Sequence, residues 1–202
     1  MRHATIFDCE FLTAEGALSR LWSGPHDPDP VVAQIGVVRL GLEGAFPLLD
    51  QRRLYVQPLG RDGQRLPLDP YFTALTGVSE ADLDREGKPL SDALAELDHF
   101  GGDTRLWCWG KDEFNMVAIS CYVQGIAPPL PAGRFGNATR LLLKAGMPAE
   151  DLRRISSGQL ADYFGLPHPP LRGHDALDDA TSIALVLRHL LTKGALQPGD
   201  LD

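Results

Sequence analysis

Residues 5–12 constrain the fold of this chain most, because they place two carboxylates on an otherwise apolar strand. Their β-branched and aromatic side chains, without glycine or proline, predict an extended strand. Side chains alternate between the two faces of a strand, so Asp8 and Glu10 point the same way. Two buried like charges are unfavourable unless a cation compensates them. The pair indicates either a divalent-metal site, better suited to Mg²⁺ or Mn²⁺ than to Zn²⁺, or a strand end whose acids lie in water.

Length and charge indicate one domain that does not coat nucleic acid non-specifically. The chain has 202 residues, 44% of them hydrophobic, which is enough for one sizeable core. Its formal net charge of −8 opposes general phosphate binding, which depends on Lys and Arg. An enzyme that grips a short strand end is compatible with this charge, because bound cations reverse the field around acidic ligands.

Cysteine usage and hydropathy predict the compartment. Cys9, Cys108 and Cys121 are far apart and form no CxxC pair, so reduced thiols are favoured over a zinc site or a disulfide framework. The sequence has no apolar run of the length of a membrane span and no signal-peptide pattern. We therefore expect a cytoplasmic protein without a membrane partner.

The order of expected elements indicates a mixed α/β sheet. Strands at 5–12, 31–40 and 49–57 follow one another without a helix, which predicts an antiparallel meander. Residues 13–30 are rich in Gly and Pro and predict a long irregular loop, whose role the sequence leaves open. A serine-capped helix is expected from Ser79, and a strand at 105–109. Helical spacing predicts further helices at 89–100, 112–124, 138–145, 157–164 and 175–191. Residues 1–192 would form the domain and 193–202 a loosely ordered tail.

Two more acids are expected to face the core from helices. On a wheel of about 100° per residue, Asp112 falls in an apolar stripe with Met116 and Ile119, whereas Glu113 falls on the solvent side. An N-cap role is the alternative for Asp112. In the last helix, Asp179 lies at the edge of the apolar stripe and needs a metal or an arginine as its partner. His174 lies on a loop five residues earlier.

Taken together, these segments resemble the DEDD superfamily of 3′→5′ exonucleases, in its His-containing (DEDDh, DnaQ-like) branch. Asp8-x-Glu10 resembles the first motif, and residues 75–78 (LTGV) resemble the recurring TGI segment. Residues 109–112 (WGKD) resemble the second motif in the WGxxD form of the histone-mRNA and small-RNA exoribonucleases. Residues 173–180 resemble the third motif, HxAxxDA. The chain departs from the family in Phe11, in Gln34 and in the long 13–30 loop, which bears on substrate rather than on catalysis.

The resemblance implies a ribonuclease-H-like fold, a five-stranded mixed sheet with its first three strands antiparallel and helices on both sides. It implies a 3′–5′ exonuclease that uses two divalent cations, Mg²⁺ or Mn²⁺, and releases nucleoside 5′-monophosphates. Asp8 would bridge the ions, Glu10 and Asp179 would complete one ion's site, and Asp112 would act on the other ion through water. His174 would accept the proton of the attacking water. The implied partner is the 3′ end of a single-stranded nucleic acid, with RNA slightly favoured over DNA.

Substrate contacts and competing functions stay open at this point. Phe11, Leu12 and Leu75 are candidates for apolar contact with the last bases, with ordinary core packing as the alternative. Lys111 and Arg172 flank the motifs and are candidates for phosphate contacts. The competing functions are a DNA proofreading or repair exonuclease, and a non-catalytic module that binds nucleic-acid ends or a protein. A ribonuclease-H-like endonuclease or transposase is a weaker alternative. Whether the chain forms a homodimer is not decided by the sequence.

Overall fold

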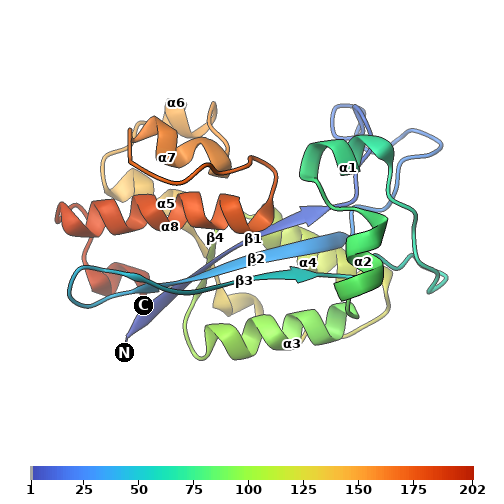
Figure 1. Cartoon of the computed structure of the whole chain (residues 1–202), viewed down its shortest axis with the longest axis horizontal. Helices are drawn as coiled ribbons and strands as arrows, with labels where there is room; N and C mark the ends of the chain where they lie inside the picture. The colour runs from blue at the N-terminus through green and yellow to red at the C-terminus, as the bar shows by residue number, and fades with distance from the viewer. Residues whose placement is uncertain (1) are drawn as a thin grey trace.

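The computed structural model describes residues 2–202 and has a five-stranded sheet in the order β3-β2-β1-β4-β5 (Figure 1). The first three strands pair antiparallel, and β4 and β5 add in parallel on the other side of β1. This confirms the expected α/β class and the antiparallel meander. The strands are β1 (His3–Phe11), β2 (Val32–Gly41), β3 (Leu48–Tyr55), β4 (Leu106–Cys108) and β5 (Phe135–Asn137).

Two layers of helices cover the sheet. One face packs against α8 (Ala176–Thr192), and α5 (Ala138–Lys144) and α7 (Leu160–Tyr163) pack beside α8 in the same cluster. The other face packs against α3 (Leu90–Gly101) and α4 (Asp112–Val123). Figure 1 shows α8 and α3 on opposite sides of the sheet. Alternation on β1 explains the division, because Ala4 and Ile6 belong to the α8 cluster whereas Phe7 and Cys9 belong to the α3 cluster.

The remaining elements are short. α1 (Pro70–Thr76) and α2 (Glu80–Glu86) lie at the end of the sheet where β1 finishes (Figure 1), and α2 begins with the expected Ser79 capping box. α6 (Ala149–Leu152) and three 3-10 turns complete the set, η1 (Ala132–Arg134), η2 (Ser157–Gln159) and η3 (Pro198–Leu201). Residues 13–30 carry neither helix nor strand, as expected. No helix within residues 2–202 is long and apolar enough to cross a membrane.

Close approach of α8 to the sheet positions the acid on its first turn. Gly36 on β2 lies opposite Asp8 on β1, and a Cβ at Gly36 would come within 2.1 Å of the backbone of Ala176 and Leu177. The Gln34 side chain accepts a hydrogen bond of 2.8 Å from the Ala176 amide. The start of α8 is therefore held directly against β2.

The C-terminal segment differs from the loosely ordered tail expected from the sequence. Leu196 and Leu201 are each 1% exposed and belong to the α8 cluster. The Trp107 indole donates a 3.1 Å hydrogen bond to the Leu201 carbonyl, and Lys144 pairs with Asp200. Leu196, just before the proline-initiated turn η3, and Leu201 within it give this segment enough apolar contact to pack. The expectation of a loose tail is wrong.

Candidate active site

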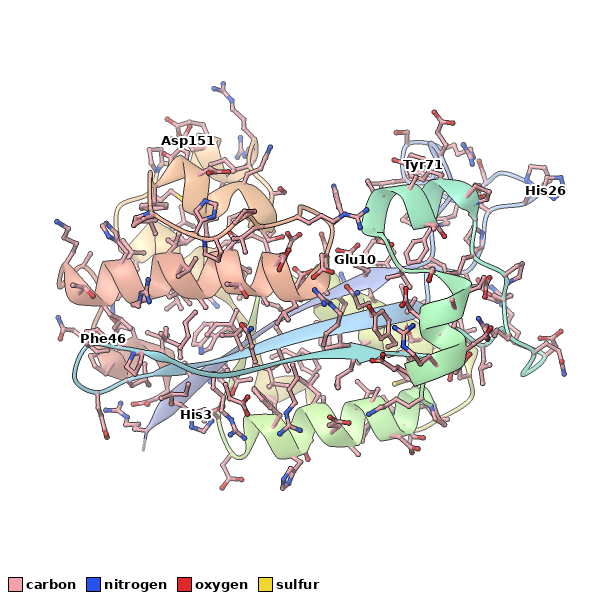
Figure 2. All side chains as sticks on the ribbon, in the orientation of Figure 1. His3, Glu10, His26, Phe46, Tyr71 and Asp151 are labelled. Carbon is pink, nitrogen blue, oxygen red and sulfur yellow. The ribbon has the colours of Figure 1, made fainter. Side chains whose placement is uncertain are left out.

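Three carboxylates converge where β1 passes beneath the first turn of α8. Asp8 and Glu10 come from one face of β1, as the alternation predicts, and Asp179 comes from α8. One oxygen of each lies within 4.8 Å of the others, and all three side chains are buried. In Figure 2, Glu10 is labelled near the end of α8 that carries Asp179. Three of the four acids expected on the core side of their elements therefore meet.

A fourth buried acid belongs to this cluster, and it is Glu113 rather than Asp112. Glu113 is 7% exposed, and its charge is the largest contribution after burial to the raised pKa of Asp8. Asp112 is exposed, with its neighbour Lys111, at the start of α4. The expectation that Asp112 faces the core and Glu113 the solvent is wrong.

The helical wheel failed because α4 is apolar on more than one side. The stripe that the structure buries is Glu113, Val117, Ser120 and Cys121. The Ser120 hydroxyl accepts a 2.9 Å hydrogen bond from the Val32 amide and docks this stripe on β2. The spacing of the WGxxD motif could have identified Glu113 from the sequence. The WGxxD form has two residues between glycine and acid, and counted from Gly110 that acid is Glu113.

Burial dominates the electrostatics of the four acids. It raises the pKa of Asp8 well above its usual value, with the charges of Glu113, Asp179 and Glu10 adding to the effect. Burial likewise raises the pKa of Glu10 to about 8 and those of Asp179 and Glu113 to about 7. Four carboxyl groups held at such cost are compensated by a bound cation or by protons.

The donor set fits a hard divalent cation. Asp179 Oδ1 and Glu113 Oε2 are buried and have no hydrogen-bond partner within residues 2–202. Carboxylate oxygens without nitrogen or sulfur ligands are the set that Mg²⁺ and Mn²⁺ prefer. Asp8, Glu10, Asp179 and Glu113 are therefore the residues that could hold a metal.

A 3-10 turn supports Asp179 from the side. The Ser157 hydroxyl donates a 3.2 Å hydrogen bond to Asp179 Oδ2. At the next residue, a Cβ on Gly158 would lie 2.3 Å from Asp179 Oδ1, so only glycine leaves this oxygen free. No sequence pattern pointed to this support, because its two partners are 22 residues apart.

His174 lies at the rim of the same cavity, on the loop that leads into α8. Its φ of +60° is left-handed, and its side chain is exposed. The next residue, Asp175, caps α8 by accepting from the Leu177 and Asp178 amides and pairs with Arg53 at 2.7 Å. The loop end is thus anchored while the imidazole faces a cavity of about 830 Å³ that also contains Asp8, Glu10, Glu113 and Asp179.

The expected substrate contacts divide into two groups. Phe11 and Leu75 line the acid cavity. Leu12 is 1% exposed and packs with Val31 and Phe72, so its expected role as a base contact is wrong. The pairing register of β1 shifts between Glu10 and Phe11, so the regular alternation does not extend to Leu12.

The two basic candidates do not line the acid cavity either. Lys111 lines a separate cavity. The Arg172 guanidinium donates to the carbonyls of Ala74 and Leu75 at 3.1 and 3.3 Å, which ties the His174 loop to α1. Neither expected phosphate contact lines the acid cavity, although the charge of Arg172 acts on Glu10 and lowers its pKa. The cavity instead presents Arg153, Arg154 and Tyr71, which carried no signal in the sequence.

Comparison with known proteins places the fold. No family model and no curated protein matches the sequence. The nuclease domain of 3′hExo, a DEDDh family member bound to rAMP, matches with a TM-score of 0.76 at 19% identity, over 96% of this chain and 93% of that one. A 3′-exonuclease structure described as showing 3′-end-specific recognition of the histone mRNA stem-loop matches with a TM-score of 0.73 at 18% identity, over 96% of this chain and 83% of that one. E. coli exonuclease I in complex with a dA16 oligonucleotide gives 0.59 at 14%, over 95% of this chain and 41% of that one. The chain has the fold of the DEDDh nucleases, as expected.

Proposed function

We propose that this protein is a metal-dependent 3′–5′ exonuclease acting on single-stranded nucleic acid. The observation that carries the proposal is the buried carboxylate cluster with two unpaired oxygens within the described chain, opening into one cavity with His174. The fold is that of nucleases solved with rAMP and with a dA16 oligonucleotide, which supports a nucleic-acid substrate.

We assign the acids to metal binding. Asp8, Glu10, Asp179 and Glu113 would together hold two divalent cations, which would be Mg²⁺ or Mn²⁺. Bound divalent ions lower the pKa of water and stabilise the departing oxygen of a phosphodiester. Glu113 replaces Asp112 in this assignment, because Glu113 is buried and its charge helps to raise the pKa of Asp8.

His174 is the proposed general base. Imidazole groups change charge near neutral pH, which suits a group that accepts a proton from water. The exposed side chain on the rim can receive the proton and release it to solvent. The product would be a nucleoside 5′-monophosphate.

The substrate strand would enter along the cavity walls. Phe11, Tyr71 and Leu75 offer apolar surface to the terminal bases, and Arg153 and Arg154 offer charge to phosphates. The two arginines form no side-chain hydrogen bond within the structure as described. We favour RNA over DNA, since two of the similar structures are described with rAMP and a histone mRNA stem-loop. The three buried free thiols support the proposed cytoplasmic location.

The test is degradation of matched RNA and DNA strands labelled at the 5′ end, with Mn²⁺, Mg²⁺ or chelator. We expect a metal-dependent ladder that shortens from the 3′ end and is lost in Asp8→Ala and His174→Ala. The faster strand decides between RNA and DNA. If the wild type binds strand ends but does not degrade them, the exonuclease proposal is wrong and the protein is a module that binds nucleic-acid ends.

A further inference from the structure

A second cavity, of about 480 Å³, lies at the β5 edge of the sheet between the start of α4 and α5. Four basic residues line it, Arg105, Lys111, Arg140 and Lys144, and none of the residues that line it is acidic. Its volume lies in the range of small-molecule sites. In a chain with a net charge of −8, this concentration of positive charge favours an anionic ligand.

Most of this charge is available for binding. Arg105, Lys111 and Arg140 are exposed, and their side chains make no ion pair or hydrogen bond with any residue in 2–202. Lys144 is the exception, since it pairs with Asp200 at 2.5 Å. Three cations without a carboxylate partner inside one cavity are free to contact phosphate oxygens.

Aromatic rings form another part of the wall. The Phe114 and Phe135 rings meet edge to face with centroids 5.2 Å apart, and both are half-buried. The Arg105 guanidinium lies 5.7 Å from the Trp107 ring centroid. Flat rings next to cations provide the two contacts that a nucleotide uses, stacking for the base and charge for the phosphate.

The turn between β4 and α4 separates this cavity from the acid cavity. Trp109, Asp112 and Glu113 line the acid cavity. Gly110, Lys111 and Phe114 line the basic cavity. Neighbouring residues of this turn and of the start of α4 therefore line the two cavities, and a strand lying across them would contact both.

We propose that the basic cavity is a second nucleotide subsite, which binds a phosphate through Arg105 and Arg140 and a base beside Phe114 and Phe135. In a nucleic-acid strand whose 3′ end occupies the acid cavity, this subsite takes a nucleotide further toward the 5′ end, and in this form it rests on the proposed exonuclease function. A free nucleotide has the same chemistry, so the test separates the two sources.

Strand length and charge reversal test the subsite by fluorescence anisotropy in chelator, which prevents hydrolysis. The probes are 5′-labelled oligoadenylate RNAs of three and twelve nucleotides, and the variants are Arg105→Glu and Arg140→Glu. We expect each variant to bind the longer strand about fivefold or more weakly and to lower its salt slope by about 0.7 per lost phosphate contact. Affinity for the shorter strand should change less than twofold. Lys193→Glu, the same charge reversal at an exposed residue outside both cavities, is the matched control.

Amide spectra of the ¹⁵N-labelled protein separate the two sources. Shifts at Gly136 and Arg140 with adenosine 5′-monophosphate support a site for the free nucleotide, and shifts with the twelve-nucleotide strand alone support a strand subsite. Unchanged affinity of both variants for the longer strand, or no shift with either ligand, overturns the subsite. If the subsite is overturned but the wild type still gives a metal-dependent degradation ladder, the exonuclease proposal holds without the subsite. If the wild type gives no ladder, the proposed function itself is wrong.

Discussion

Asp8 is buried among three other acidic side chains. Its carboxyl group lies among those of Glu10, Glu113 and Asp179, and burial together with their charges raises its pKa. A residue in this position stabilises the fold only when protons or cations compensate the charge. The same four groups therefore link stability to pH and to metal.

Metal-free protein should lose stability as pH rises. Glu10, whose pKa burial raises to about 8, and Asp179, raised to about 7, bind protons in the folded state that the unfolded chain has released above about pH 4.5. Because the folded state then holds more protons, the free energy of unfolding falls with pH between about 5 and 8, by on the order of a few kcal/mol. Thermal unfolding in chelator measures it.

A bound divalent cation should offset the loss of stability at high pH, which the same thermal-unfolding experiment can show. Mn²⁺ competes with protons for the carboxylates, so the increase in Tm that it causes should be larger at pH 8 than at pH 5. A Tm in chelator that does not change between these pH values would contradict the assignment of raised pKa values to the cluster.

At the scale of single elements, contact between α8 and β2 positions Asp179. Gly36→Ala should lower the free energy of unfolding by about 2–4 kcal/mol, because the new Cβ would meet backbone atoms of Ala176 and Leu177 that cannot rotate away. Metal affinity should fall with it. Gly41→Ala, on the same strand but 3.1 Å or more from its nearest neighbours, is the control and should change stability much less. Equal effects in denaturant titrations would argue against close packing of α8 as the cause.

The elements also show how far the sequence predicts this fold. Runs of β-branched and apolar residues identified β1 and β2, and helical periodicity identified α3 and α8. These elements carry Asp8, Glu10 and Asp179. β5 has three residues including Gly136, too few for a periodic pattern. The orientation of α4 was predicted wrongly because its apolar residues surround the helix, and only docking of Ser120 on β2 selects the buried stripe. Tertiary contacts, not local propensity, decide such cases.

At the scale of the whole molecule, the C-terminal segment closes the α8 cluster. Deleting residues 193–202 removes two leucines that are each 1% exposed and leaves the Trp107 indole without its carbonyl partner. We expect the free energy of unfolding to fall by about 3 kcal/mol or more. Urea titration of the full and shortened chains measures the difference. An unchanged midpoint would restore the view of a loose tail.

The acid cavity and the basic cavity lie on opposite sides of the turn between β4 and α4. The molecule thus carries an acidic site and a basic site next to each other, in a chain of negative net charge. Its fold is shared with nucleases at less than 25% identity, whereas its fourth buried acid is Glu113, one residue after the Asp112 expected from the sequence. The identity of this acid is the point on which the proposed chemistry depends.

The most direct measurement compares Glu113→Gln with Asp112→Asn in single-turnover cleavage of a 5′-labelled strand across a Mn²⁺ titration. Both substitutions remove one negative charge at neighbouring positions and change little in size. We predict that Glu113→Gln lowers the cleavage rate by about 100-fold and weakens Mn²⁺ binding, whereas Asp112→Asn changes either quantity less than about threefold. Loss of activity in Asp112→Asn with Glu113→Gln fully active would contradict the buried four-acid metal site.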